Sequence, residues 1–296
     1  MTDPTPWEAP SPTAADLAPT WLGLVDDAAI FPPGEAALPD AVAAFTARRS
    51  EWYADFVGPL VVRDTDVAAV PEPLPLAVVV TGGAGAIEGP AALAARKGHT
   101  LVALEIALRD LDDLPGNARR VNAAVDAARD SGALADGTRI HVELPTTGPD
   151  GPSHGWLAAA DVVSEAEHRL KFRTGGLTPD DFPSAQTLVA WIDAALDREL
   201  PFKCTAGLHR AIRHTDDSGQ VHHGFVNVLV ATSMLIDGAG RTEAERLLGS
   251  SDVETVTREA MNTFLAGGRR WFTSFGSCSV TEPVESLVAT GLLVDV

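Results

Sequence analysis

The chain repeats one pattern of hydrophobic and polar positions eight times: a short apolar or alternating run, then a stretch with helical periodicity. Short runs bounded by glycine or proline are typical of strands, whereas apolar residues three and four apart are typical of amphipathic helices. The predicted strands are 22–30, 57–63, 76–81, 100–108, 139–144, the two lysine-bearing runs within 169–176 and 201–209, and 270–275. The predicted helices are 39–50, 89–97, 115–130, 155–168, 183–199 and 283–290, and only a short helical turn, 65–70, follows the second strand.

Eight consecutive strand–helix units predict a (β/α)8 TIM barrel, formed by a single domain over residues 21–296. The alternative, an open doubly wound sheet, expects central strands that are apolar on both faces. Here the fourth to seventh strands carry polar residues at alternate positions, which places them on one face. These residues are Glu105, Arg139, His141, Glu143, Lys171, Arg173, Lys203 and Thr205. A barrel accommodates polar residues near the carboxyl ends of its strands, so the pattern favours the barrel.

Two segments fall outside the repeat. Residues 209–268 separate the seventh and eighth strands, a length far beyond what one crossover helix needs. We expect a buried helix at 224–238 and one or two more within 242–266, and we interpret the polar start of the segment as a lid or a substrate-facing loop. Residues 1–20, rich in proline, alanine and threonine, are predicted to form a flexible arm.

Composition narrows the class of protein. With 45% hydrophobic and 21% charged residues, the chain is typical of a globular protein with a large core. The net charge of -19 argues against nucleic acids and anionic membranes as partners. Neither a signal peptide nor a membrane-spanning apolar run is evident, and two cysteines make no disulfide framework. We expect a cytoplasmic protein, and a homo-oligomer is compatible with the sequence.

Lysine is used sparingly. Only three of the 22 basic residues are lysines, and two of them, Lys171 and Lys203, occupy matching inward positions of neighbouring predicted strands. Unlike arginine, lysine loses its proton when it is desolvated or placed near another cation, and the neutral amine is a nucleophile. The rarity of lysine and the inward positions of Lys171 and Lys203 favour a chemical role for these two residues. The alternative is that both lysines form structural ion pairs with Glu105 and Glu143.

Carboxylates and histidines supply further candidate chemistry. Glu105 and Glu143 end the fourth and fifth strands, where barrel enzymes place general acids and bases. With His209 and His222 they could instead bind a divalent metal, although no H-x-H or H-E-x-x-H pattern supports this. His141 lies one pleat deeper and is expected to be a hydrogen-bonded core residue. Of Asp26 and Asp27, which close the first strand, one is expected to face inward. Ser274 lies in the eighth strand, ahead of a helix start where barrels often bind phosphate.

Five short runs together resemble class I deoxyribose-phosphate aldolases, which are TIM barrels that form a lysine Schiff base. Lys171-Phe172-Arg173-Thr174-Gly175 is similar to the family's K-T-S-T-G-type run on strand six, which carries the Schiff-base lysine. Lys203-Cys204-Thr205-Ala206-Gly207-Leu208-His209 is similar to the K-x-S-G-G-I-R-type run on strand seven, whose lysine lowers the pKa of the first. Leu24-Val25-Asp26-Asp27, His141-Val142-Glu143-Leu144 and Thr273-Ser274-Phe275-Gly276 resemble runs of strands one, five and eight.

The sequence departs from this family at three points. Arg173 replaces a small residue beside the presumed nucleophile, His209 ends the run where the family has arginine, and the 209–268 excursion has no counterpart. These departures concern phosphate binding above all, so the chain is compatible with an uncharacterised branch of the family that has another substrate.

The resemblance implies a Schiff-base aldolase that needs no cofactor or metal and acts on a small anionic carbonyl compound. Lys171 would be the nucleophile and Lys203 would keep it partly neutral, while Glu143 or Asp26 moves protons. Arg173, His209 and Arg213 would hold an anionic group, carboxylate as readily as phosphate, and the predicted substrate site is completed by Glu105, Thr205 and Ser274. Two alternatives stay open: a metal-dependent lyase or isomerase that uses Glu105, Glu143 and His209, and a non-catalytic barrel that binds a small molecule.

Overall fold

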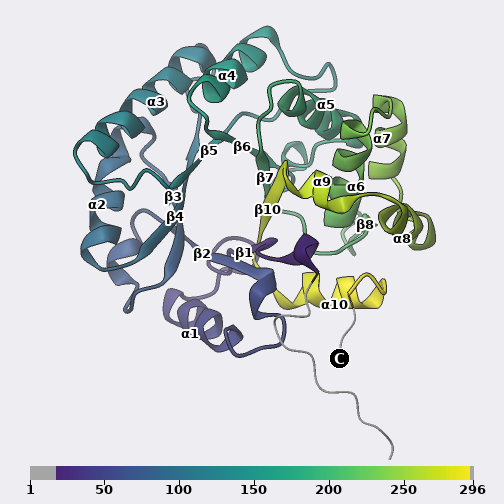
Figure 1. Cartoon of the computed structure of the whole chain (residues 1–296), viewed down its shortest axis with the longest axis horizontal. Coiled ribbons are helices and arrows are strands. Elements are labelled where there is room, and N and C mark those ends of the chain that lie inside the picture. Colours follow the sequence, from purple (N-terminus) through teal and green to yellow (C-terminus); the bar gives the residue numbers. More distant parts are fainter. Residues whose placement is uncertain (1–17, 294–296) are drawn as a thin grey trace, which may run out of the picture.

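The computed structural model describes residues 18–293 and contains a closed barrel of eight parallel strands (Figure 1). The strands neighbour one another in the order β1-β10-β7-β6-β5-β4-β3-β2. They are β1 (Val25–Asp27), β2 (Val57–Arg63), β3 (Pro75–Val80), β4 (Thr100–Ala107), β5 (Arg139–Glu143), β6 (Arg169–Arg173), β7 (Phe202–Thr205) and β10 (Phe272–Ser277). The predicted TIM barrel is therefore confirmed.

Helices follow the strands in the predicted rhythm (Figure 1). They are α1 (Leu38–Arg48), α2 (Glu88–Arg96), α3 (Leu114–Asp130), α4 (His154–Glu165), α5 (Ala185–Leu196) and α10 (Thr281–Ala289). Between β2 and β3 only the 3₁₀ turn Val67–Ala69 forms, in agreement with the prediction. The strand 22–30 was predicted too long: β1 begins after Gly23, which has φ +56°, and ends where Asp27 accepts a hydrogen bond from the Ala29 N–H.

Large apolar side chains pack between the outer wall of the barrel and the helices. Phe172 on β6 lies 6.4 Å from Trp156 on α4, 5.6 Å from Trp191 on α5 and 5.0 Å from Phe202 on β7, measured between ring centroids. Because strand side chains alternate between faces, this outward packing of Phe172 sends Lys171 and Arg173 into the barrel.

The inside of the barrel is divided between an apolar wall and a charged wall. Val61, Ala77 and Ala103, on β2, β3 and β4, form a small buried cluster against which Phe31 and Val79 pack. Most of the charged inward side chains come from β1, β4, β5, β6 and β7 and are described below. A substrate in the mouth would therefore meet small apolar side chains on one side and ionic groups on the other.

The excursion after β7 builds a second helical layer outside the barrel. α6 (Phe225–Ile236) is almost entirely buried, and Phe225 stacks on Phe275 of β10 at 4.9 Å between ring centroids. Packed against α6 are α7 (Arg241–Leu248), α8 (Val253–Asn262) and α9 (Leu265–Arg269), so three further helices form where one or two were predicted. α6 thus takes the place of the usual crossover helix.

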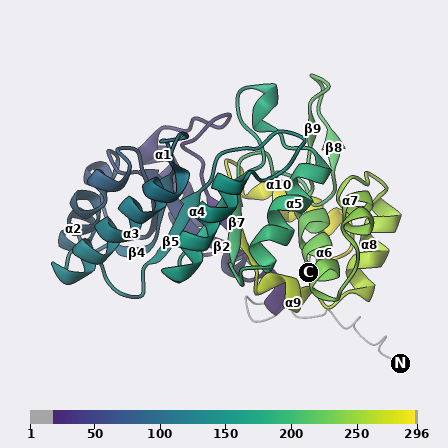
Figure 2. The same ribbon diagram turned by 90° about the horizontal axis from the view of Figure 1, so that it is seen from above.

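A small hairpin that was not predicted precedes α6. It consists of β8 (His214–Thr215) and β9 (Val221–His222) and projects from the end of the molecule opposite α9 (Figure 2). The loop before the hairpin crosses the start of α6, where the carbonyl groups of Arg210 and Ala211 accept the N–H groups of Phe225 and Val226. A side chain at Gly224 would meet the Ala211 carbonyl oxygen at 2.4 Å, so this crossing requires glycine. The lid role predicted for residues 209–268 stays a prediction.

The predicted arm, residues 1–20, falls mostly outside the described residues, which begin at residue 18. Its last residues are placed: Pro19–Trp21 form a 3₁₀ turn, and the Trp21 side chain is buried. Arg269 donates hydrogen bonds to the carbonyl groups of Thr20 and Leu22, at 2.8 and 2.9 Å, and so fastens this turn to α9. None of the helices among residues 18–293 is long and apolar enough to cross a membrane.

Candidate active site

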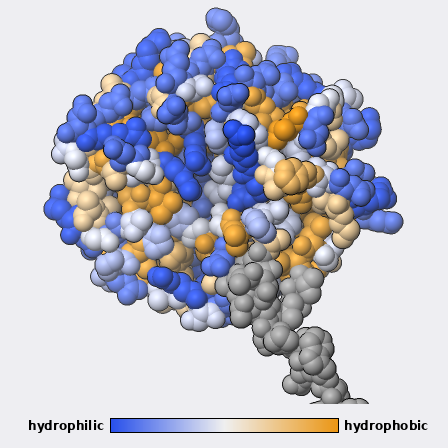
Figure 3. All heavy atoms as spheres, viewed as in Figure 1, coloured by the Kyte–Doolittle hydropathy of each residue, from blue (hydrophilic) through white to orange (hydrophobic). Residues whose placement is uncertain are grey.

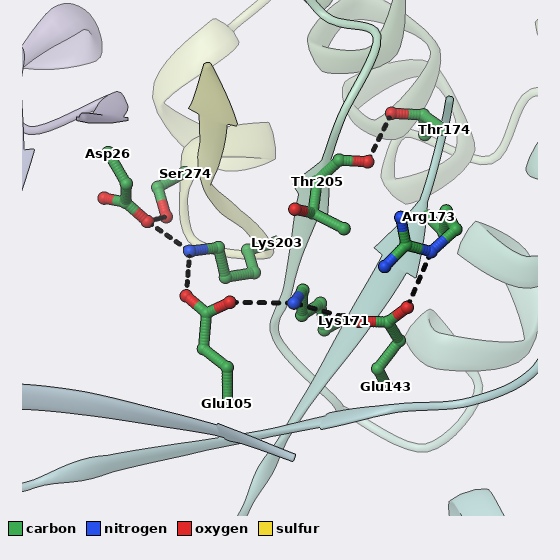
Figure 4. Close-up of polar contacts among 9 residues, drawn as sticks. All are labelled: Asp26, Glu105, Glu143, Lys171, Arg173, Thr174, Lys203, Thr205 and Ser274. Carbon is green, nitrogen blue, oxygen red and sulfur yellow. Dashed lines mark hydrogen bonds and ion pairs between the residues drawn. The ribbon is translucent and has the colours of Figure 1, made fainter. Parts of the chain in front are cut away.

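The pairing register of the strands brings the candidate side chains together at one level of the barrel. Lys171 on β6 is paired with Lys203 on β7, and Glu143 on β5 is paired with Lys171. Glu105 lies on β4, next to β5. Figure 4 shows these side chains converging from their separate strands.

Six of them form one continuous chain of ion pairs, ordered Asp26, Lys203, Glu105, Lys171, Glu143 and Arg173 (Figure 4). Lys203 Nζ pairs with an oxygen of Asp26 and lies 2.6 Å from Glu105 Oε1. Lys171 Nζ lies 2.8 Å from Glu105 Oε2 and 2.9 Å from Glu143 Oε2. At the far end, Arg173 Nε lies 2.9 Å from Glu143 Oε1. Three cations thus alternate with three anions.

From Lys203 to Arg173, the exposure of the side chains increases along this ion-pair chain. The side chains of Lys203 and Lys171 are 1% and 4% exposed, that of Glu143 is 11% exposed and that of Arg173 is 37% exposed. Buried charges are tolerated when each is paired and hydrogen-bonded, and the alternation achieves this. A molecule that enters from solvent would therefore meet Arg173 and Glu143 first and Lys171 next.

Both lysines are stabilised as ammonium ions, which corrects our expectation that Lys203 keeps Lys171 partly neutral. Burial by itself disfavours the charged form of Lys171, but Glu105 and Glu143 outweigh burial and Lys203 together, so the pKa of Lys171 is raised. The pKa of Lys203 is also raised, because Asp26 and Glu105 outweigh its burial. Before any substrate binds, Lys171 therefore forms the ion pairs with Glu105 and Glu143 that the sequence left open as the alternative to a chemical role.

The three carboxyl groups differ in their proton affinity. Burial opposes ionisation of Glu105, yet Lys171 and Lys203 hold its pKa well below the usual range. Glu143 has a lowered pKa for the same reason, with Lys171 and Arg173 as its partners. Burial raises the pKa of Asp26 despite its contacts with Lys203 and Ser274. Glu105 therefore stays ionised, whereas Asp26 is the carboxyl group of the site that takes up a proton most readily.

Three further predictions near the ion-pair chain can be placed. Asp26 is the inward residue of its pair, since Asp27 pairs with Arg48 of α1 at 2.5 Å. Ser274 donates a hydrogen bond to Asp26 Oδ2 at 3.0 Å. Thr205 is paired with Arg173 in the sheet, and its carbonyl oxygen accepts the Thr174 hydroxyl at 3.2 Å, a contact between the ends of β6 and β7 that sequence reasoning missed (Figure 4).

His209 and Arg213 are not in contact with the ion-pair chain in the described residues. His209 Nδ1 lies 3.0 Å from Glu282 Oε2 of α10, and its Nε2 lies 3.8 Å from Cys278 Sγ. Arg213 donates its backbone N–H to Asn227 of α6 at 2.9 Å. Their predicted roles in holding substrate stay predictions.

The two histidines proposed as metal ligands do not join Glu105 and Glu143 at one point. Glu105 and Glu143 are bound to lysines, His209 is bound to Glu282, and His222 is bound to Asp216 at 3.0 Å. Within residues 18–293 no group of three or more His, Cys, Asp or Glu side chains is arranged to hold a metal ion. These residues therefore do not fit the metal-dependent alternative.

His141 is buried as predicted, but the prediction of a hydrogen-bonded core residue is wrong. Neither ring nitrogen has a partner among the described residues. Burial, followed by the nearby Lys203, lowers the pKa of His141 well below its usual value, so the ring is neutral beneath the ion-pair chain. No sequence signal distinguishes such a histidine from one that is hydrogen-bonded.

Comparison with known proteins gives relatives in structure only. No family model matches the sequence, and no curated protein matches it. Among solved structures, a deoxyribose-phosphate aldolase from Aeropyrum pernix, described as a tetramer, matches with a TM-score of 0.53 and 13% identity. That match covers 93% of this chain and 94% of the other. A structure from Toxoplasma gondii ME49, named as a deoxyribose-phosphate aldolase in its apo form, matches with a TM-score of 0.50 and 13% identity over 92% of this chain and 94% of the other. The predicted likeness to these aldolases is confirmed for the fold.

Proposed function

We propose that this protein is a Schiff-base-forming, aldolase-type carbon–carbon lyase that acts on a small carbonyl compound with an anionic group. The observation that carries the proposal is the position of Lys171, buried between Glu105 and Glu143 and paired in the sheet with Lys203. The similarity of the barrel to deoxyribose-phosphate aldolases supports the same class of reaction.

Lys171 must lose a proton before it can attack, and Arg173 offers the means. Glu143 is shared between Lys171 and Arg173, and Arg173 is the most exposed member of the ion-pair chain. An anionic substrate group that binds Arg173 competes with Glu143 for the guanidinium. Glu143 then loses one of the two cations that lower its pKa, so it becomes a better acceptor for the proton of Lys171, only 2.9 Å away.

The neutral amine then attacks the substrate carbonyl carbon, and loss of water leaves a protonated imine. In the cleavage direction, Asp26 takes the proton of the hydroxyl group two carbons from the imine carbon. The bond between the hydroxyl-bearing carbon and the carbon next to the imine carbon breaks. Its electron pair forms the enamine double bond while the imine electron pair moves to the nitrogen, and the hydroxyl-bearing carbon departs as an aldehyde. Protonation and hydrolysis of the resulting enamine release the second product and restore Lys171. Throughout, Glu105 stays ionised and holds both lysines.

Reductive trapping tests this assignment. Borohydride, added with a panel of aldehydes and keto acids that carry phosphate or carboxylate groups, should reduce the imine to a stable secondary amine. Intact mass should show one adduct per chain, and peptide mapping should locate it on Lys171. The mapping is simple because only Lys97, Lys171 and Lys203 are lysines.

Other outcomes favour other functions. An adduct on Lys203 alone would reverse the roles of the two lysines. Absence of any adduct, together with a tightly bound metal in protein purified without chelator, would support the metal-dependent lyase or isomerase. Shifts in melting temperature with these ligands, but without adduct or turnover, would support a binding barrel.

Replacing Arg173 by glutamine should weaken the use of anionic substrates in particular. Loss of one charge-assisted hydrogen bond is expected to raise KM by about 10- to 100-fold. A carbonyl substrate that lacks the anionic group should show little change. The measurement is the ratio of KM values for the two substrates in each variant.

Arg63→Gln is the matched control. Arg63 ends β2 beside the apolar wall, is 39% exposed and lies 4.7 Å from the Phe31 ring centroid. An equal loss of affinity for anionic and neutral substrates in Arg173→Gln, or the same loss in Arg63→Gln, would contradict the role given to Arg173.

A further inference from the structure

A pocket lies at the opposite end of the barrel strands from the ion-pair chain. It has a volume of about 370 Å³ and is formed where the chain enters β5 and β6. We call it the basal pocket. Its walls include Arg129 near the end of α3, together with Arg139 and Arg169, the first residues of β5 and β6. Figure 3, in the same view as Figure 1, shows hydrophilic side chains near the centre of that face of the molecule.

The three arginines of the basal pocket have no acidic partner. Within residues 18–293, none of Arg129, Arg139 and Arg169 makes an ion pair, a state they share with exposed arginines elsewhere such as Arg49, Arg96 and Arg246. Acidic residues outnumber basic ones in this chain by 41 to 22, so counter-ions are abundant. What distinguishes Arg129, Arg139 and Arg169 is that all three line one pocket.

Two buried nitrogen atoms at the pocket also have no hydrogen-bond partner among the described residues. They are Nε of Arg129 and Nε2 of His168, and His168 is 3% exposed. Buried polar atoms are nearly always satisfied by protein, water or a ligand. Burial and then the nearby Arg139 lower the pKa of Arg169, which is the sign of two cations held close together.

We propose that the basal pocket binds a small multivalent oxyanion, of the phosphate or polycarboxylate kind. Arginine suits such ligands because its planar guanidinium group donates two parallel hydrogen bonds to their oxygen atoms. The volume lies at the lower end of the range of small-molecule sites. Asp136 and Glu167 also line the pocket, which leaves an excess of positive charge and two acceptors for hydroxyl groups of the ligand.

The position of the pocket separates it from the proposed substrate site. β5 runs from Arg139 to Glu143, and β6 runs from Arg169 past Lys171 to Arg173, so the two sites occupy opposite ends of the same two strands. An oxyanion in the basal pocket need not displace a substrate at the mouth.

Calorimetric titration of the full chain with citrate, and separately with pyrophosphate, tests the proposal. We expect saturable binding of at least one of them at one site per chain. A preference for citrate or for pyrophosphate shows whether the pocket selects carboxylate or phosphate groups. Arg139→Gln and Arg169→Gln should each weaken binding at least about tenfold. Arg169→Lys, which keeps the charge, should weaken it less.

Two controls locate the bound anion. Arg258→Gln removes the same charge from α8, where the side chain is 55% exposed, and should leave the affinity unchanged. Arg173→Gln should also leave it unchanged, because Arg173 lies at the other end of the barrel. No saturable binding to the wild-type chain, or equal weakening in Arg258→Gln, would overturn the proposal. Weakening in Arg173→Gln alone would place the anion at the mouth and would overturn it as well.

Discussion

Replacing Lys171 by arginine is expected to abolish imine formation and to lower turnover on the order of 10⁶-fold, as loss of a covalent nucleophile does elsewhere. Arginine keeps the positive charge between Glu105 and Glu143, so neither buried carboxylate loses its cation. It stays protonated at ordinary pH and cannot attack a carbonyl. The measurements are borohydride trapping and steady-state turnover of the variant, with thermal unfolding to show that it folds.

The chain offers a matched control for this variant in Lys97→Arg. Lys97 follows α2 and donates to the Ala68 carbonyl at 2.6 Å, outside the barrel, so this variant should trap substrate as the wild-type chain does. An undiminished adduct in Lys171→Arg, mapped to Lys203, would show that the nucleophile lies on β7 instead.

The fold was predictable because its signal is local and repeated. Each strand needs only a short apolar or alternating run, and the alternation by itself places Lys171 and Lys203 on the inner face. Glu105 and Glu143 followed in the same way, because the carboxyl ends of parallel strands meet at one end of a barrel. The predicted elements therefore identified both lysines and their neighbouring carboxylates as members of one site.

The pairing partners, and with them the protonation states, could not be predicted from the same pattern. Whether Lys171 is closer to Lys203 or to Glu143 depends on strand register and side-chain reach, which alternation does not specify. The pKa of Lys171 responds to a balance of burial, two carboxylates and one ammonium, and the carboxylates prevail. Similarly, nothing in the spacing of the loop after β7 indicates that His209 contacts Glu282 of α10.

Replacing Glu105 by glutamine is expected to destabilise the fold by about 3–5 kcal/mol at pH 7, the usual cost of removing one partner from a buried ion pair. Glu105 is 2% exposed and contacts both lysines, at 2.6 and 2.8 Å. Its loss leaves the two neighbouring ammonium groups without the carboxylate between them. The ion-pair chain then holds three cations and only two anions. The free energy of unfolding, measured by urea denaturation, checks the magnitude, and Glu259→Gln on α8 is the exposed control, expected to lie within about 0.5 kcal/mol of wild type.

The pH dependence of this variant should differ from that of the wild-type chain. In the wild type, the raised pKa values of both lysines mean that their contribution is fully present below the unfolded value, about 10.4, and is lost only as pH rises through the folded pKa values. Without Glu105, repulsion and burial should push at least one lysine pKa below its unfolded value. The folded variant then binds fewer protons than the unfolded chain, so its stability should increase between pH 7 and 10, where the lysine contribution in the wild type is constant. A variant whose loss of stability is the same at pH 7 and pH 9.5 would show that Glu105 does not hold the two lysines in their charged form.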